Sequence, residues 1–186
     1  MALEFKGFPK IPRFTGFGTT ITEKIDGTNA GVFVDDDGYV TAASRKRWIT
    51  PEADNFGFAQ WVADNTDQLL TLGPGMHWGE WWGQGIQRGY GLTERRFSLF
   101  NVSRWDPKIR EGAPALPDCC GLVPVLAQIP IFTEAEIRLV LQRLGERGSL
   151  AAPGFTNPEG IVINHHAAKQ LFKLTFTDAH KGEQSR

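Results

Sequence analysis

The sequence predicts an α+β fold built around antiparallel strands, in a chain of single-domain size. The chain has 186 residues, which is long enough to bury a sizeable core without disulfide or metal support. Its 21 glycines, 13 phenylalanines and 6 tryptophans favour strands that are joined by tight turns. Short β-branched and aromatic runs recur along the chain, whereas amphipathic helical spacing is confined to a few segments.

Strands are expected wherever β-branched and aromatic residues form short runs bounded by turn residues. The expected strands span residues 20–25, 31–34, 39–43, 76–82, 97–102, 160–164 and 171–176. The sequence Asp-Asp-Asp-Gly at 35–38 joins the second and third of these strands and is typical of a hairpin turn. The proline-rich segment 106–118 is expected to be a surface loop.

Helices are expected between these strands. The sequence Thr-Pro-Glu at 50–52 indicates a helix start, because proline is favoured in the first helical turn. Apolar residues then follow helical spacing over 58–69, and Gly-Pro at 73–74 ends the run. A capping box at 133–136 begins a further amphipathic helix, for which Gly145 is the expected end.

Composition and charge exclude several classes of protein. The 20 basic and 21 acidic residues give a formal net charge of −1, which argues against a general polyanion binder but allows a local basic cleft. The only cysteines are the neighbours Cys119 and Cys120, and no long apolar segment indicates a signal peptide or membrane span. We therefore expect a reduced, cytoplasmic protein without membrane contact. Its expected parts are an extended segment at 1–18, a domain at 19–177 and a polar tail at 178–186.

The segment Glu23-Lys24-Ile25-Asp26-Gly27-Thr28-Asn29 lies at the end of the first expected strand. A lysine at a strand end, followed by a glycine-containing turn, can be held rigidly with its amine facing a cleft. The same pattern is also common at the edge of an ordinary hairpin, so the segment alone does not assign a function.

Further charged and aromatic side chains follow this lysine in order. Arg45 offers a guanidinium group for phosphate, Glu80 and Glu159 place carboxylates on or beside expected strands, Phe97 begins an aromatic strand, and Lys173 lies on the last strand. In this order and at these spacings, the set resembles the RNA ligase family over roughly residues 20–176. That family belongs to the covalent nucleotidyltransferases, together with ATP-dependent DNA ligases and mRNA capping enzymes.

The resemblance implies a fold and a reaction. The fold would be a nucleotidyltransferase (ligase adenylation) domain of ATP-grasp-like type, with antiparallel sheets lining a nucleotide cleft and no separate OB-fold domain. Lys24 would attack the α-phosphorus of ATP to form lysyl-AMP and release pyrophosphate, while Lys173 neutralises phosphate charge. AMP would then pass to an RNA 5′-phosphate, which a 3′-hydroxyl attacks to seal the strand.

The resemblance also implies binding roles. The positions that would contact the nucleotide are Glu23, Ile25, Asn29, Arg45, Glu80, Phe97, Glu159 and Lys173. Glu80 would bind the ribose hydroxyls and Phe97 would stack on adenine, which leaves Phe100 for the core. Asn29 would support the phosphate end, and Glu159 would help to hold Mg²⁺, for which Mn²⁺ could substitute.

Thr175 departs from the family pattern, since it stands where a second lysine is usual. This departure leaves a catalytically impaired nucleic-acid-binding module as an alternative. A DNA ligase or a capping guanylyltransferase on the same scaffold is a further alternative. The expected partners are RNA ends, with an RNA-binding partner protein as an open alternative. Trp78, Trp81 and Trp82 could belong to the core or could stack RNA bases, and the sequence does not separate these two roles.

Overall fold

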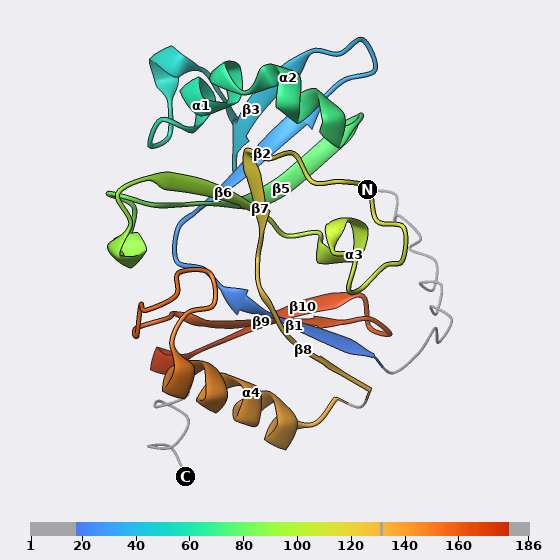
Figure 1. Cartoon of the computed structure of the whole chain (residues 1–186), viewed down its shortest axis with the longest axis vertical. Coiled ribbons are helices and arrows are strands. Elements are labelled where there is room, and N and C mark those ends of the chain that lie inside the picture. Colours follow the sequence, from blue (N-terminus) through green and yellow to red (C-terminus); the bar gives the residue numbers. More distant parts are fainter. Residues whose placement is uncertain (1–17, 131, 179–186) are drawn as a thin grey trace, which may run out of the picture.

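The computed structural model describes residues 18–130 and 132–178. Figure 1 shows two twisted sheets, one above the other, with helices on their outer faces. The smaller sheet has the order β10-β9-β1-β8, and all its neighbouring strands are antiparallel. The larger sheet has the order β4-β3-β2-β5-β6-β7, in which only the β6–β7 pair is parallel. The expected mixed fold with antiparallel sheets is confirmed.

The strands fall into the two sheets as follows. The smaller sheet contains β1 (Thr19–Lys24), β8 (Val125–Ile129), β9 (Gly160–His165) and β10 (Gln170–Thr175). The larger sheet contains β2 (Thr28–Val34), β3 (Val40–Ser44), β4 (Trp48–Ile49), β5 (Gly75–Gly83), β6 (Arg95–Leu99) and β7 (Cys120–Leu122). The chain crosses between the sheets at the β1–β2 and β7–β8 connections (Figure 1).

Helices lie on the outer faces of both sheets and, at one place, between the sheets (Figure 1). They are α1 (Phe58–Asp64), α2 (Thr66–Leu69), α3 (Val102–Trp105) and α4 (Glu134–Arg147), with short 3-10 turns at Pro51–Ala53, Leu70–Leu72 and Gly89–Gly91. Helices α1 and α2 lie on the larger sheet and α4 lies on the smaller one (Figure 1). No helix in the described ranges is long and apolar enough to cross a membrane.

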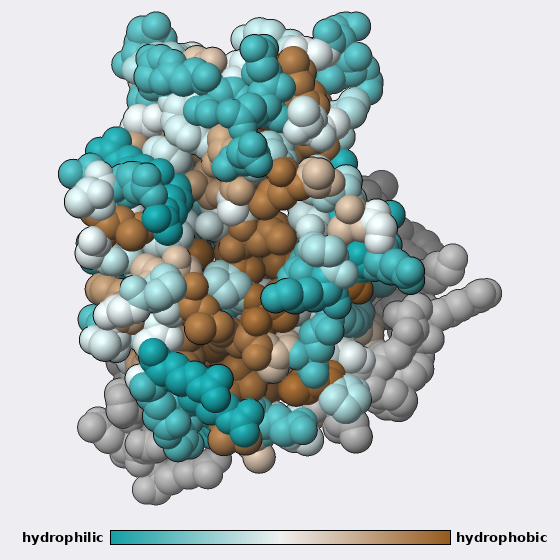
Figure 2. Space-filling model, viewed as in Figure 1, coloured by the Kyte–Doolittle hydropathy of each residue, from teal (hydrophilic) through white to brown (hydrophobic). Residues whose placement is uncertain are grey.

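The buried apolar residues form three clusters. Two of them lie between a sheet and its helices, and the third joins the two sheets. The larger core includes Phe58, Trp81 and Phe97, and the smaller one includes Ile21 and Leu144. A further cluster around Ile25 and Trp82 lies where the two sheets meet. Figure 2 shows hydrophobic residues gathered across the middle of the view, with hydrophilic residues predominating over the α1–α2 end. The inner faces of the two sheets are therefore free to form a cleft beside this junction.

Several elements differ from the sequence expectation. The expected helix at 58–69 is two helices, because the chain breaks at Asn65, whose amide donates to the Trp61 carbonyl oxygen. The expected strand at 97–102 ends at Leu99, since the Asn101 side chain caps α3 by accepting a hydrogen bond from the Arg104 amide. The capping box of α4 is confirmed, but the helix continues past Gly145 to Arg147.

Three short strands were missed by the sequence interpretation. They are β4, β7 and β8. The segment of β8 lies between two prolines, which favour turns, and its pairing with β1 is a long-range contact. The helix start expected at 50–52 is only a 3-10 turn. The expectations for residues 1–17 and 179–186 lie outside the described residues.

Candidate active site

A pocket of about 440 Å³ opens between the inner faces of the two sheets. One side is formed by residues of β1, β9 and β10, and the other by residues of β2, β5 and the 100–103 segment. Apolar residues such as Phe100 and Val162 line it beside the polar residues Lys24 and Glu80. A concave, mainly apolar pocket with a few converging polar groups is typical of a small-molecule site.

Strand alternation places Lys24 in this pocket. Successive side chains of a strand point to opposite faces of its sheet. Thr20, Thr22 and Lys24 all line the pocket, whereas Ile21 belongs to the core beneath α4 and Glu23 is buried against residues 149–151. The end of β1 thus carries the Lys24 amine into the cleft, as the sequence pattern suggests.

Lys24 forms an ion pair across the cleft floor. Its Nζ lies 2.7 Å from Glu159 Oε2, and the two side chains are 24% and 18% exposed. The pair forms because Lys24 lies opposite Gly160 in the β1–β9 ladder, next to Glu159. The structure therefore brings together two of the residues that the sequence singles out, 135 positions apart.

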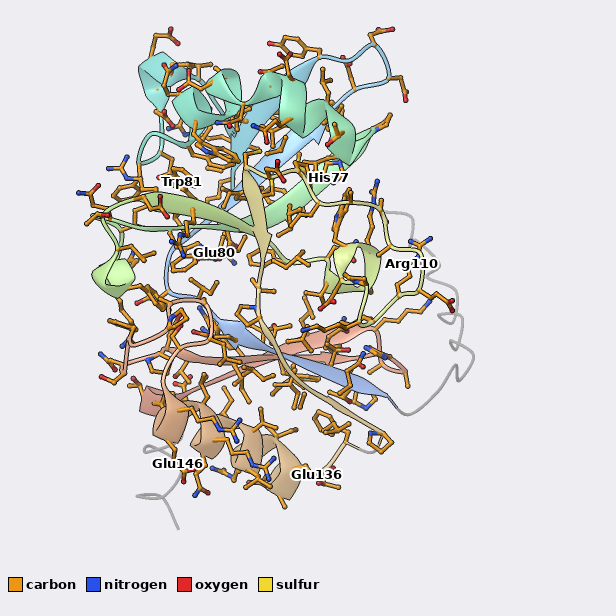
Figure 3. All side chains as sticks on the ribbon, viewed as in Figure 1. His77, Glu80, Trp81, Arg110, Glu136 and Glu146 are labelled. Carbon is orange, nitrogen blue, oxygen red and sulfur yellow. The ribbon has the colours of Figure 1, made fainter. Side chains whose placement is uncertain are left out.

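Glu80 is the second carboxylate of the cleft. It is only 7% exposed and accepts hydrogen bonds from the Gly27 backbone amide at 3.2 Å and from Asn29 Nδ2 at 3.0 Å. Figure 3 shows Glu80 on the side of the larger sheet that faces the smaller sheet, and Trp81 on the side toward α1. A Cβ at Gly27 would meet the Trp81 carbonyl oxygen at 2.5 Å, so only glycine allows this close approach of the loop to β5.

Burial raises the pKa of Glu80 to about 7, and the nearby positive charge of Lys24 opposes the rise. A carboxyl group whose pKa is raised by folding favours the folded state fully only below its ordinary value of 4.5. This contribution is lost as the pH rises through about 7. We therefore expect the free energy of unfolding of the wild type to fall, relative to Glu80→Gln, by up to about 3 kcal/mol between about pH 4.5 and 8.

Urea unfolding of both proteins across this pH range tests the expectation for Glu80. The glutamine cannot ionise, but it also cannot accept both hydrogen bonds, which changes stability at every pH. The relevant quantity is therefore how the difference in free energy of unfolding between the two proteins changes with pH. A difference that stays constant over the range would show that Glu80 does not titrate near neutrality.

The aromatic assignment is corrected by the structure. Phe97 is 1% exposed and packs against Phe58 and Trp61 in the core under α1. Phe100 is 40% exposed and lines the pocket. The two residues lie on opposite faces, as expected for residues three apart, but Phe97 is the one in the core. The expectation that Phe97 stacks on the base is therefore wrong, and Phe100 is the ring available to the cleft.

Glu23 and Ile25 flank Lys24 and line the pocket, but their side chains belong to the interior. The Glu23 carboxylate accepts hydrogen bonds from the Ser149 hydroxyl at 2.5 Å, the Leu150 amide at 2.8 Å and the Ala151 amide at 3.1 Å. This carboxylate therefore anchors the segment after α4 and leaves only the Glu23 backbone for the pocket.

Removing this anchor is expected to destabilise the fold. Glu23→Ala leaves the buried Ser149 hydroxyl and the Leu150 and Ala151 amides without their shared acceptor, so we expect the free energy of unfolding to fall by about 3 kcal/mol. Urea unfolding measures this loss, and the exposed Glu111→Ala serves as a matched control. Equal stabilities of the two variants would contradict the anchoring role.

Two further positions named from the sequence lie at the margins of the cleft. Lys173 lies opposite Val162 in the β9–β10 ladder, on the cleft face, and its side chain is exposed. Arg45 is exposed in the β3–β4 turn and is not among the residues that line the pocket. Thr175 is buried and its hydroxyl donates to Asp178 Oδ2 at 2.7 Å, so this position provides no cation.

The loop after Lys24 is held by contacts that the sequence does not predict. Arg88 Nε lies 2.9 Å from Asp26 Oδ2, and the Tyr90 hydroxyl accepts a hydrogen bond from the Asp26 amide at 2.8 Å. Arg88 also donates to the Asn157 carbonyl oxygen at 3.3 Å, near Glu159. Arg88 therefore links the segments that carry the Lys24–Glu159 pair, and no local sequence signal indicates this link.

The donor set fits a divalent cation that is shared with substrate phosphates. In the described part of the chain, no cluster of three or more histidine, cysteine, aspartate or glutamate side chains could hold a metal by itself. Glu159 and Glu80 both present carboxylate oxygens near the Lys24 amine. Mg²⁺ is commonly bound by one or two carboxylates together with phosphate oxygens and water, and this arrangement meets that requirement.

The fold is similar to that of solved RNA ligase structures from Naegleria gruberi. A variant of that ligase with ATP and Mn aligns over 93% of this chain and 53% of its own, at 19% identity and a TM-score of 0.59. A variant with AMP and Mn aligns over 93% and 54%, at 22% identity and a TM-score of 0.63. The ligase with PPi aligns over 92% and 53%, at 21% identity and a TM-score of 0.59.

The chain thus spans about half the length of these structures. A comparison with curated proteins found no match. The family model described as RNA ligase matches residues 19–175, which include both sheets and every cleft residue described above. The match extends over most of the chain, and on that basis the protein belongs to the RNA ligase family.

Proposed function

We propose that this chain is an ATP-dependent RNA ligase that forms a covalent lysyl-AMP at Lys24. The observation that carries the proposal is the position of Lys24, which lines the cleft together with Glu80 and forms an ion pair with Glu159. Membership of the RNA ligase family and similarity to ligase structures with ATP, AMP and PPi support it.

The pocket offers complementary groups for each part of ATP. Phe100 and Val162 provide apolar surfaces from opposite sides of the pocket for the adenine ring. The ionised Glu80 carboxylate can accept hydrogen bonds from the ribose hydroxyls. The phosphates would then extend toward Lys24, Asn29 and the exposed Lys173, where positive charge and amide donors are available.

Lys24 must lose a proton before it can attack, because an ammonium group has no free electron pair. The carboxylate of Glu159 is within hydrogen-bond distance of this proton. A divalent cation, Mg²⁺ or Mn²⁺, when bound at Glu159 and the phosphates, would supply positive charge that favours the uncharged amine and stabilises charge on the phosphates. Lys173 would add a second positive charge at the α-phosphate as pyrophosphate leaves.

The later steps would use the same site. AMP would move from Lys24 to the 5′-phosphate of an RNA end, and a 3′-hydroxyl would then attack that phosphate and release AMP. All three reactions are displacements at phosphorus, so the same cationic groups can stabilise each transition state. Arg45, exposed at the margin of the cleft, would contact the RNA end.

A catalytically impaired nucleic-acid-binding module is the second candidate, and Thr175 is the observation that favours it. Its hydroxyl is hydrogen-bonded to Asp178, so the position of the second family lysine carries no charge. This candidate predicts RNA binding without release of pyrophosphate.

A sealing assay tests the proposal against these alternatives. The protein is incubated with Mg²⁺ and either ATP or GTP, together with RNA or DNA that carries 5′-phosphate and 3′-hydroxyl ends. We expect pyrophosphate release with ATP and joined RNA on a denaturing gel. Preference for DNA ends or for GTP would identify a DNA ligase or a capping enzyme, and RNA binding without pyrophosphate release would identify the binding module.

A further inference from the structure

Exposed aromatic side chains continue along the inner face of the larger sheet beyond the nucleotide pocket. Strand alternation places Trp78 on the same face as Glu80, and the registers of β2, β3 and β4 bring Phe33 and Trp48 to that face as well. Trp48 is 54% exposed and Trp78 is 40% exposed. We call Trp78, Trp48 and Phe33 the aromatic face.

The rings of the aromatic face are held in place by their neighbours. Trp78 lies over Gly31, where an added Cβ would approach the indole ring to 2.9 Å. The Phe33 and Trp48 rings meet edge to face, with their centroids 5.7 Å apart. The absence of a side chain at Gly31 therefore lets the indole lie close to the sheet.

Trp78 of the aromatic face lies beside the pocket, on the same face of β5 as the pocket residue Glu80. The backbone amide of Phe100, which lines the pocket, donates to the Trp78 carbonyl oxygen at 3.0 Å. The face crosses the sheet from the end of β6 to β4, a distance on the order of 19 Å from four strand spacings. A polymer end that reacts in the pocket can therefore extend directly onto these rings.

Charge at the two ends of this face differs in sign. The β3–β4 turn carries the exposed residues Arg45, Lys46 and Arg47, and it lies near the pocket because Ser44 pairs with Ala30, next to Asn29. No carboxylate forms an ion pair with these three side chains in the described part of the chain. The acidic turn at 35–37 lies at the far end of β2.

We propose that the aromatic face and the basic turn at 45–47 bind the single-stranded RNA end on which the pocket acts. RNA bases would stack on Trp78, Trp48 and Phe33, because exposed rings on a sheet stack unpaired bases with little dependence on sequence. The basic turn would neutralise the phosphates nearest the pocket. This proposal rests on the proposed function and assigns its RNA-binding surface.

Binding of a fluorescein-labelled single-stranded RNA, followed by anisotropy, tests the proposal on the full chain. We expect Trp48→Ala and Trp78→Ala each to weaken binding about tenfold, whereas Trp48→Phe and Trp78→Phe retain most of it. Lys46→Gln is expected to lower the slope of log Kd against log salt by about 0.7. Phe172→Ala is the matched control, since this exposed ring lies on β10 facing away from the cleft.

Label from ATP that is retained on the denatured protein is measured in parallel, so that failure of this proposal is distinguishable from failure of the proposed function. Weaker RNA binding with unchanged labelling supports the RNA-binding face. Wild-type affinity in both alanine variants would overturn it, even if labelling is normal. Loss of both labelling and RNA binding in these variants would also overturn the proposal and would assign the rings to the fold. If the wild type is an oligomer and Trp48→Ala dissociates it, the proposal is likewise overturned, and the rings belong to a protein interface.

Discussion

Replacing Lys24 with alanine is expected to abolish retention of labelled adenylate on the protein, by at least about a thousandfold. This amine is the proposed nucleophile, and a charge elsewhere in the cleft cannot replace a covalent nucleophile. The half-buried side chain is not part of an apolar core, so the fold should persist. The measurement is label from α-labelled ATP that remains after denaturation, with circular dichroism to confirm the fold.

Two control variants sharpen this experiment. Lys24→Arg keeps a positive charge beside Glu159 but removes the nucleophile, so it should also fail to retain label. Lys108→Ala removes an exposed lysine outside the pocket and should label normally. Retention of label by Lys24→Ala would assign the nucleophile to another residue, and normal labelling of Lys24→Arg would contradict direct attack by this amine.

Phe97→Ala and Phe100→Ala are expected to have opposite consequences. Phe97 is fully surrounded by core rings, so its truncation should lower the free energy of unfolding by about 4 kcal/mol. Phe100 is partly exposed in the pocket, so its truncation should cost little stability but weaken ATP binding at least about tenfold, through loss of base stacking. Urea unfolding and equilibrium ATP titration measure the two effects.

The contrast between the two variants is itself the test of the corrected assignment. If Phe97→Ala weakened ATP binding without loss of stability, the base would stack on the core side of β6. If Phe100→Ala left ATP binding unchanged, the apolar wall of the pocket would not hold the nucleotide.

The sequence was most informative where one segment carries a complete local pattern. Lys24 follows a β-branched strand and precedes Asp26-Gly27, and the structure places its amine in the cleft. The apolar residues that follow the Thr133 capping box at helical spacing likewise predict α4 and its buried face. In both cases the required information lies within a few neighbouring residues.

Features that depend on contacts between distant parts of the chain could not be predicted from local sequence patterns. Alternation shows that Phe97 and Phe100 face opposite sides, but only the packing of α1 against β6 decides which side is the core. The Arg88–Asp26 pair joins residues 62 positions apart. The β8 strand is recognisable only through its partner β1. Local patterns thus predict single elements, and the assembled sheets determine which faces meet.

The most direct test of covalent catalysis at Lys24 is mass analysis of the protein after incubation with ATP and Mg²⁺. The intact mass should increase by one adenylate, and proteolytic mapping should place it on the peptide that contains Lys24. Prior treatment with pyrophosphate removes any adenylate already present on the purified protein. An adenylate mapped to a different lysine, or none on a folded protein freed of prior adenylate, would contradict the account.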